Sequence, residues 1–336
     1  MVSAHGRFSI LLLSALAALI AVAVATPGHD RATAATRPAA VVERVVQPST
    51  PMDPPRPLEP LWLTDLHARF PSMTSLLAPR FSVLPNNQII SYYGNPYTDL
   101  MGILGAGDLA SMADALERQA ARYDALNGPL DVMPAIHLVY AVAQPHPTDN
   151  GLYLQYVDDG AVLRYFALAE ERDMLLFLDL QIGRSTVKDE IEKVLPLLRN
   201  PRVHLALDPE FAVDGESTPG DVIGSLSAED IDVAQSMLQD LVIAERLPPK
   251  ILMVHQFLDG MVRSGESITY YQGVDLIIDM DGFGPAAVKR ATYEEYASRT
   301  YAAHAAIKLF FDHDPDLMSE REVLLLNPIP AIVIYQ

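Results

Sequence analysis

Acidic residues end several short apolar runs in the second half of the sequence. Alternate side chains of a strand share a face, so residues two apart point to the same side. Three pairs have this spacing: Asp179 with Gln181, Asp208 with Glu210, and Asp279 with Asp281. A carboxylate at the end of an apolar run costs free energy unless it is paired, ligated or used in chemistry. Helix capping explains single aspartates. The whole set, with His255 and Lys308 at neighbouring run ends, predicts one shared site.

Paired carboxyl groups of this kind can cleave a glycosidic bond. One group must be protonated to donate to the leaving oxygen, and the other must be ionised as a nucleophile or as a base for water. Crowding of like charges raises one of the two pKa values into the range that an acid needs. Glu210 is the predicted acid, because Asp208 two residues earlier can hold it by charge and hydrogen bonding. Asp279 or Asp281 is the predicted second carboxylate, across the site.

The segment Asp208-Pro209-Glu210 ends the fourth apolar run. It is similar to the Asp-x-Glu that closes the fourth-strand motif of the family 18 chitinases, and to a comparable element of the family 25 lysozymes. In those families the Glu is the proton donor, and the resemblance implies this role for Glu210. The longer chitinase motif has further acids upstream, where this sequence has Val203 and Ala206. The resemblance is therefore to barrel glycoside hydrolases in general and assigns no single family.

Further polar and aromatic residues near the run ends complete the predicted site. We expect nine of them to bind substrate: Tyr93, His137, Asp179, Gln181, His255, Gln256, Lys308, Asp312 and Tyr335. Aromatic rings at such places can stack on sugar faces. The predicted partner is a carbohydrate or another small polar substrate, and the predicted chemistry requires no cofactor.

A divalent-metal enzyme is the main alternative. The acids Asp179, Asp208, Glu210, Asp279, Asp281 and Asp312 offer hard oxygen ligands for Mg, Mn or Ca, and His137 or His255 could add a nitrogen. Such a site would suit a barrel hydrolase or isomerase. The sequence lacks the His-Glu-x-x-His spacing of a two-histidine zinc motif. Lys308 would also compete with a metal for the same carboxylates.

Two further alternatives remain open at this point. A non-catalytic barrel can keep a glycan-binding site after losing turnover, because fold does not determine function. A Schiff-base enzyme could use Lys308 as its nucleophile, but neighbouring carboxylates would raise the pKa of that amine and disfavour attack.

The elements that would position these residues alternate regularly. Eight short apolar runs read as strands: Gln88–Tyr93, Val132–Val142, Met174–Gln181, Val203–Phe211, Lys250–Phe257, Val274–Gly282, Ala306–Asp312 and Ala331–Gln336. Helical stretches lie between them: Asp108–Leu126, Asp159–Glu171, Thr186–Leu198, Ser227–Arg246, Gly260–Ser267, Ala286–Arg299 and Ser319–Leu326. Parallel strands need crossover helices. Eight such units predict a (β/α)8 TIM barrel, with the final strand at the C-terminus and the predicted site at the strands' C-terminal ends.

Charge and cysteine content exclude several classes of function. The net charge is -19 and no run of Lys or Arg is present. Binding to a nucleic-acid backbone is therefore disfavoured. The sequence has no cysteine, which excludes disulfides, thiolate metal sites and cysteine nucleophiles.

The N-terminal part has a different composition from the rest. Residues 1–25 combine Arg7 with an apolar run that ends in Ala23-Val24-Ala25, which predicts a signal peptide and a secreted or cell-surface protein. Membrane contact is expected only if this segment stays uncleaved. Residues 26–60 are rich in Pro and Ala and predict a disordered linker. Residues 61–336 form the predicted barrel domain, in which a helix near Trp62 would cover the gap left by the last strand.

Overall fold

The computed structural model describes residues 82–84, 86–299 and 301–336, and the predicted signal peptide, linker and Trp62 helix lie outside them. Eight parallel strands form the centre: β1 (Asn87–Gly94), β2 (Asp131–Ala143), β4 (Leu175–Gln181), β5 (Val203–Asp208), β7 (Lys250–Gln256), β9 (Val274–Met280), β10 (His304–Leu309) and β11 (Ile332–Tyr335). Each strand pairs with the next along the chain, and β1 pairs with both β2 and β11. The sheet therefore closes, which confirms the predicted (β/α)8 barrel.

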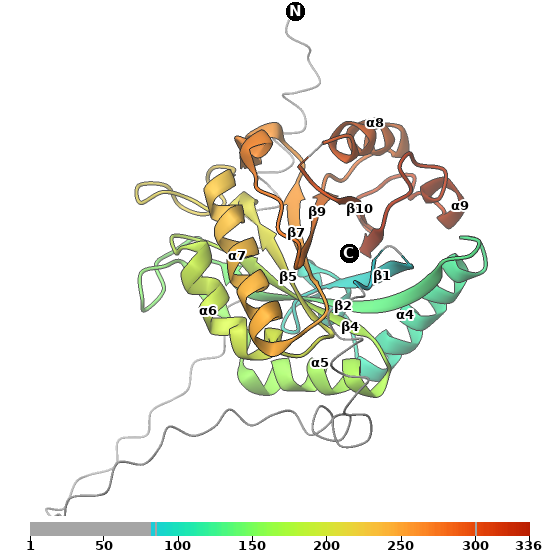
Figure 1. Cartoon of the computed structure of the whole chain (residues 1–336), viewed down its shortest axis with the longest axis horizontal. Helices are drawn as coiled ribbons and strands as arrows, with labels where there is room; N and C mark the ends of the chain where they lie inside the picture. The colour runs from blue at the N-terminus through green and yellow to red at the C-terminus, as the bar shows by residue number, and fades with distance from the viewer. Residues whose placement is uncertain (1–81, 85, 300) are drawn as a thin grey trace, which may run out of the picture.

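Helices surround the strands (Figure 1). They are α4 (Leu109–Asp124), α5 (Asp159–Glu171), α6 (Val187–Leu198), α7 (Ala228–Glu245), α8 (Ala286–Ala297) and the single turn α9 (Glu320–Val323). A capping box begins α7, where the side chains of Ser227 and Asp230 each accept from the other's backbone N–H. Ser319 and Glu322 begin α9 in the same way. Among the described residues, no helix is long and apolar enough to span a membrane.

Several element boundaries differ from the sequence prediction. The predicted helix Gly260–Ser267 is instead two 3-10 turns, η4 (Asp259–Met261) and η5 (Gly265–Ser267), around the short strand β8 (Val262–Arg263). This strand pairs with β6 (Leu226–Ser227). The fourth barrel strand ends at Asp208 and not at Phe211, because Pro209 begins the 3-10 turn η3 (Pro209–Phe211). Strand β3 (Leu154–Tyr156), antiparallel to β2, was not predicted.

The core has two layers that follow from strand alternation. Inward side chains such as Ile89, Phe177 and Met253 fill the barrel, while outward ones such as Leu178 and Val254 pack against the helices. All five are fully buried. Burying an aliphatic or aromatic side chain of this size contributes about 1.5–3 kcal/mol, so both layers stabilise the frame that holds the strand ends in place.

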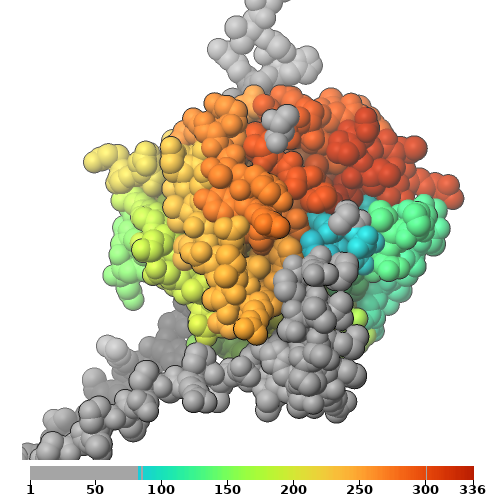
Figure 2. All heavy atoms as spheres, in the orientation of Figure 1, coloured from blue at the N-terminus to red at the C-terminus, as the bar shows by residue number. Residues whose placement is uncertain are grey.

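Closure brings the first strand beside the last. Ile89 of β1 lies opposite Ile332 of β11, and Tyr92 lies opposite Tyr335. Figure 2 shows the segment around β1, in cyan, directly against the orange and red C-terminal half. Side chains from both halves of the sequence therefore meet inside one barrel.

Candidate active site

A polar layer lies inside the barrel near the C-terminal ends of its strands. Asp179, His255, Asp279 and Lys308 are all at most 3% exposed. On each of their strands, the residue two positions earlier is apolar and belongs to the inner core: Phe177, Met253, Ile277 and Ala306. The charged groups thus rest on an apolar floor, where electrostatic interactions are stronger than in water.

His255 is the centre of this layer. Its Nδ1 lies 2.8 Å from Asp279 Oδ2 and 3.3 Å from Asp281 Oδ2. Its Nε2 lies 3.3 Å from Asp179 Oδ2. Burial alone would lower the pKa of His255, but Asp179, Asp279 and Asp281 raise it well above its ordinary value. Without a metal, His255 is therefore a cation that neutralises part of the acidic set.

Lys308 provides the second cation. Its Nζ lies 3.1 Å from Asp281 Oδ1 and 3.6 Å from the centre of the Tyr93 ring. Such a cation over an aromatic face gains both charge–quadrupole attraction and cover from water. Lys308 and Tyr93, from the seventh and first barrel strands, thereby hold the carboxylate of Asp281 in place.

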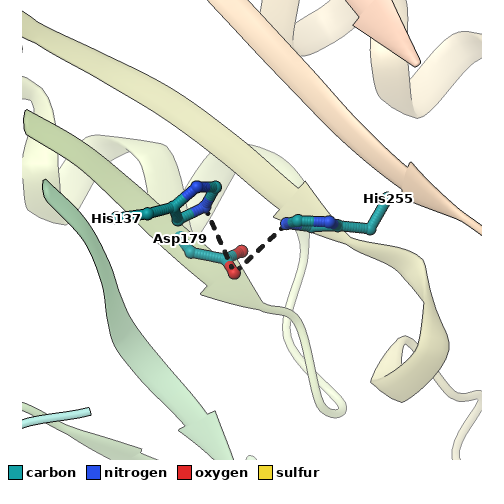
Figure 3. A group of neighbouring side chains, drawn as sticks. All are labelled: His137, Asp179 and His255. Atoms are coloured by element: carbon teal, nitrogen blue, oxygen red, sulfur yellow. Dashed lines mark ion pairs between the residues drawn. The ribbon is translucent and has the colours of Figure 1, made fainter. Parts of the chain in front are cut away.

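His137 and Asp179 form a second buried pair of the group (Figure 3). His137 Nε2 is 3.6 Å from Asp179 Oδ2, and both side chains are inaccessible to solvent. Burial lowers the pKa of His137 despite the neighbouring Asp179. Burial would raise the pKa of Asp179, but His255 and His137 hold it well below its ordinary value. This pair is therefore a neutral imidazole beside an ionised carboxylate.

Asp208 and Glu210 lie one layer nearer the strand ends. Gln181 Nε2 donates to Asp208 Oδ2 at 3.3 Å, while Asp208 Oδ1 accepts from the backbone N–H of Glu210 at 3.0 Å. The Glu210 carbonyl accepts from Gly224 N–H at 2.6 Å. A Cβ at Gly224 would clash with the Pro209 and Ala212 carbonyls, so only glycine lets this loop close over η3.

Burial raises the pKa values of three acids at the strand ends, and neighbouring charges modify this rise. Burial, followed by the charges of Asp179 and Asp281, raises the pKa of Asp208 to about 7. Burial and the charges of Asp208 and Asp281 raise the pKa of Glu210 well above its ordinary value. Burial also raises the pKa of Asp281, but Lys308 and His255 oppose this rise. Glu210 thus retains its proton to higher pH than an exposed glutamic acid does.

Three of the predicted site residues lie away from this cluster. Gln256 follows His255 and so points to the opposite face of β7, where it bonds the Leu258 carbonyl and the Tyr301 hydroxyl. The Tyr335 hydroxyl lies 2.8 Å from that of Tyr123 on α4, outside the barrel. Asp312 is exposed in the loop after β10, because this strand ends at Leu309.

Two residues that the sequence reasoning missed support the site from behind. Lys289 Nζ lies 3.1 Å from Asp314 Oδ2, and both side chains are buried. Lys289 also donates to the Gly282 and Lys308 carbonyls at 2.6 Å each. Asp314 accepts from Phe310 N–H at 2.9 Å. Together they connect the loops after β9 and β10, and nothing in the spacing of Asp312 and Asp314 distinguishes the buried acid from the exposed one.

Comparison with known proteins shows only distant likeness. No protein-family model matches the sequence, and no curated protein matches it either. A GH18 chitinase from Pseudoalteromonas aurantia superposes with a TM-score of 0.38 and 12% identity, over 74% of this chain and 93% of that one. A sugar phosphate isomerase/epimerase from Parabacteroides distasonis gives 0.36 and 10%, over 76% and 88%. Both are TIM barrels, and likeness at this level carries no argument about function.

Proposed function

We propose that this barrel hydrolyses glycosidic bonds, with Glu210 as the proton donor and Asp281 as the second carboxylate. One contrast supports the assignment. Within the described part of the chain, no cationic side chain lies within ion-pair distance of Glu210, whereas Asp281 contacts Lys308 at 3.1 Å and His255 at 3.3 Å. Glu210 therefore has no nearby cation to favour its ionised form, whereas Asp281 lies near two cations, and glycoside hydrolysis needs this division of roles.

Asp281 suits the second role better than Asp279. Asp279 is fully buried, and its Oδ2 is 2.8 Å from His255 Nδ1. The Asp281 side chain retains 11% exposure, so it lies nearer to the solvent-facing end of the barrel. Asp279 then acts as a positioning residue through His255.

The bond changes follow from these positions. Glu210 gives its proton to the glycosidic oxygen as the bond from that oxygen to the anomeric carbon breaks, and the bonding electrons go to the leaving oxygen. The positive charge that develops on the sugar ring is stabilised by the Asp281 carboxylate. Water then supplies the hydroxyl group, and its proton returns to the carboxylate of Glu210 or Asp281.

The decisive experiment compares Glu210→Gln with wild-type protein on a panel of glycans and aryl glycosides. We expect kcat/KM to fall about 10²–10⁴-fold on substrates with poor leaving groups. The loss should be smaller on aryl glycosides whose leaving groups need no proton. Asp281→Asn should lose activity on both kinds of substrate alike.

Asp312→Asn is the matched control, since this exposed acid lies in the loop after β10 and should leave the rates unchanged. If the wild-type protein binds glycans in calorimetry but cleaves none of them, the hydrolase proposal is wrong and the barrel is a glycan-binding protein. If Glu210→Gln loses activity equally on both leaving-group classes, Glu210 is not the proton donor.

A further inference from the structure

We propose that His137, Asp179 and His255 form a binding site for a divalent transition-metal ion of the zinc class, one layer beneath Glu210 and Asp281. Their ligand atoms come from three different barrel strands and lie within 4.8 Å of one another. Figure 3 shows both imidazole rings directed toward the same carboxylate. The site shares His255 with the proposed glycosidase chemistry, in which His255 contacts the Asp281 carboxylate at 3.3 Å, but none of the three side chains acts there as acid or base.

The two separations from the Asp179 carboxylate to the imidazoles fit metal coordination better than hydrogen bonding. Asp179 Oδ2 lies 3.3 Å from His255 Nε2 and 3.6 Å from His137 Nε2. A tetrahedral zinc ion binds nitrogen and oxygen at about 2.0–2.2 Å, which places neighbouring ligand atoms about 3.2–3.6 Å apart. A charge-assisted hydrogen bond would be shorter, as is the 2.8 Å contact between His255 Nδ1 and Asp279.

The same atoms lack other partners. Within the described residues, neither nitrogen of His137, neither oxygen of Asp179, nor His255 Nε2 has a hydrogen-bond partner. All three residues are fully buried. Buried polar atoms without partners are rare in native proteins and call for an ion, a water or a functional role. A cation at the meeting point of these atoms would satisfy one atom from each side chain at once.

A supporting carboxylate is already present around His255. Metal-binding histidines usually donate their other ring N–H to a carboxylate or carbonyl, which orients the ring and raises its basicity. Asp279 Oδ2 accepts from His255 Nδ1 in this arrangement, at 2.8 Å. Two imidazoles and one carboxylate with a free fourth position make the type of ligand set found in zinc enzymes, and they favour a borderline ion over Mg²⁺ or Ca²⁺.

Metal analysis of the untagged full chain tests the site. Protein purified without a polyhistidine tag should contain about one zinc-class ion per chain. After removal with a chelator it should take up Zn²⁺ or Co²⁺ with the same stoichiometry in calorimetry. Uptake should raise the thermal unfolding temperature, because the ion binds the folded chain. X-ray absorption of the zinc-loaded wild type should show two imidazoles at about 2.0–2.1 Å, without reliance on any variant.

His137→Gln and His255→Gln should abolish uptake, and Asp279→Asn should weaken it about 10–100-fold. His204→Gln is the matched control, because His204 is also a fully buried histidine inside the barrel, but on β5 and outside the group. A chelator-stripped wild type that takes up neither Zn²⁺ nor Co²⁺ would overturn the proposal and leave His255 as a protonated bridge between Asp179 and Asp279. Retention of the ion in folded His137→Gln and His255→Gln would overturn it equally, by placing the metal elsewhere.

Discussion

Buried polar side chains have different kinds of partner at the two ends of the barrel. At the N-terminal end, Lys250 is fully buried and donates to the Asn200 and Val203 carbonyls, at 2.6 and 2.9 Å. His204 Nδ1 accepts from Ile251 N–H at 3.1 Å. At the C-terminal end, by contrast, buried charged side chains contact one another, and the carboxylates outnumber the cations His255 and Lys308. Backbone pairing is typical of structural groups, whereas crowded side-chain charge is typical of a site that acts on a ligand.

A second contrast separates two lysines of the C-terminal end. Lys289 pairs with Asp314 where both are buried, and it binds two carbonyls that connect adjacent loops. Lys308 pairs with Asp281, which keeps 11% of its side chain exposed and also contacts His255. The first pair stabilises the loops, and the second sets the charge of the candidate site. Although the two ion pairs have similar lengths, we expect removal of one partner to affect mainly stability in the first pair and mainly the candidate site in the second.

The largest effect on stability is expected at Lys289. Lys289→Met leaves the buried Asp314 carboxylate without its cation, which costs about 3–5 kcal/mol of unfolding free energy. Lys308→Met should cost less stability, because Asp281 keeps its contact with His255, and should instead impair glycan cleavage. Urea unfolding and initial rates for both variants provide the measurement. Equal destabilisation by the two changes would contradict the separation of roles.

Lys250 should make stability depend on pH. Burial lowers the pKa of Lys250 to about 7, below the value of about 10.4 for an unfolded lysine. Between these two pH values the unfolded chain therefore binds more protons than the folded chain. The free energy of unfolding is highest above the unfolded pKa of Lys250 and decreases as the pH falls toward 7. We expect roughly 2–3 kcal/mol of added stability between pH 7 and 9. This rise, measured by denaturant unfolding, should disappear in Lys250→Met.

Asp208→Asn should shift the pH profile of catalysis. The negative charge of Asp208 raises the pKa of Glu210 after burial does. Its removal therefore lowers the pKa of Glu210, and the alkaline limb of kcat/KM should move to lower pH. The measurement is a pH–rate profile for both proteins. An alkaline limb that stays in place would show that Glu210 does not control it.

Tyr335→Phe should give the smallest effect. The hydroxyl contacts Tyr123 at 2.8 Å and Gln119 at 3.2 Å on α4, so its loss should cost about 1 kcal/mol of stability. Glycan affinity and cleavage should not change, because the ring lies outside the barrel. Tyr93→Phe is the variant for comparison, because Tyr93 lies inside the barrel with Lys308 Nζ over its ring. A glycan-binding defect in Tyr335→Phe would show that Tyr335 contributes to substrate binding.

Much of the architecture was predictable because it depends on local patterns. Run length and the alternation of strands with helices led to the closed barrel, and the helical stretches predicted from Ser227 and Ser319 do begin there, each with a capping box. The prediction Gly260–Ser267 was wrong because a short helix-like run cannot reveal that β8 pairs with β6. Pairing between distant segments has no local signal in a single sequence.

For the site, the sequence by itself determined which polar residues share a face. The period of two placed Asp179 with Gln181, and the same period excludes Gln256 and Tyr335 once the inward face of each strand is known. Only the tertiary structure decided that His137, Asp179 and His255 converge, that Asp314 is buried while Asp312 is exposed, and which acids have a cation nearby. Side-chain direction along a strand is a local property of the backbone, whereas proximity between strands depends on barrel closure and register, which the packing of the whole chain selects.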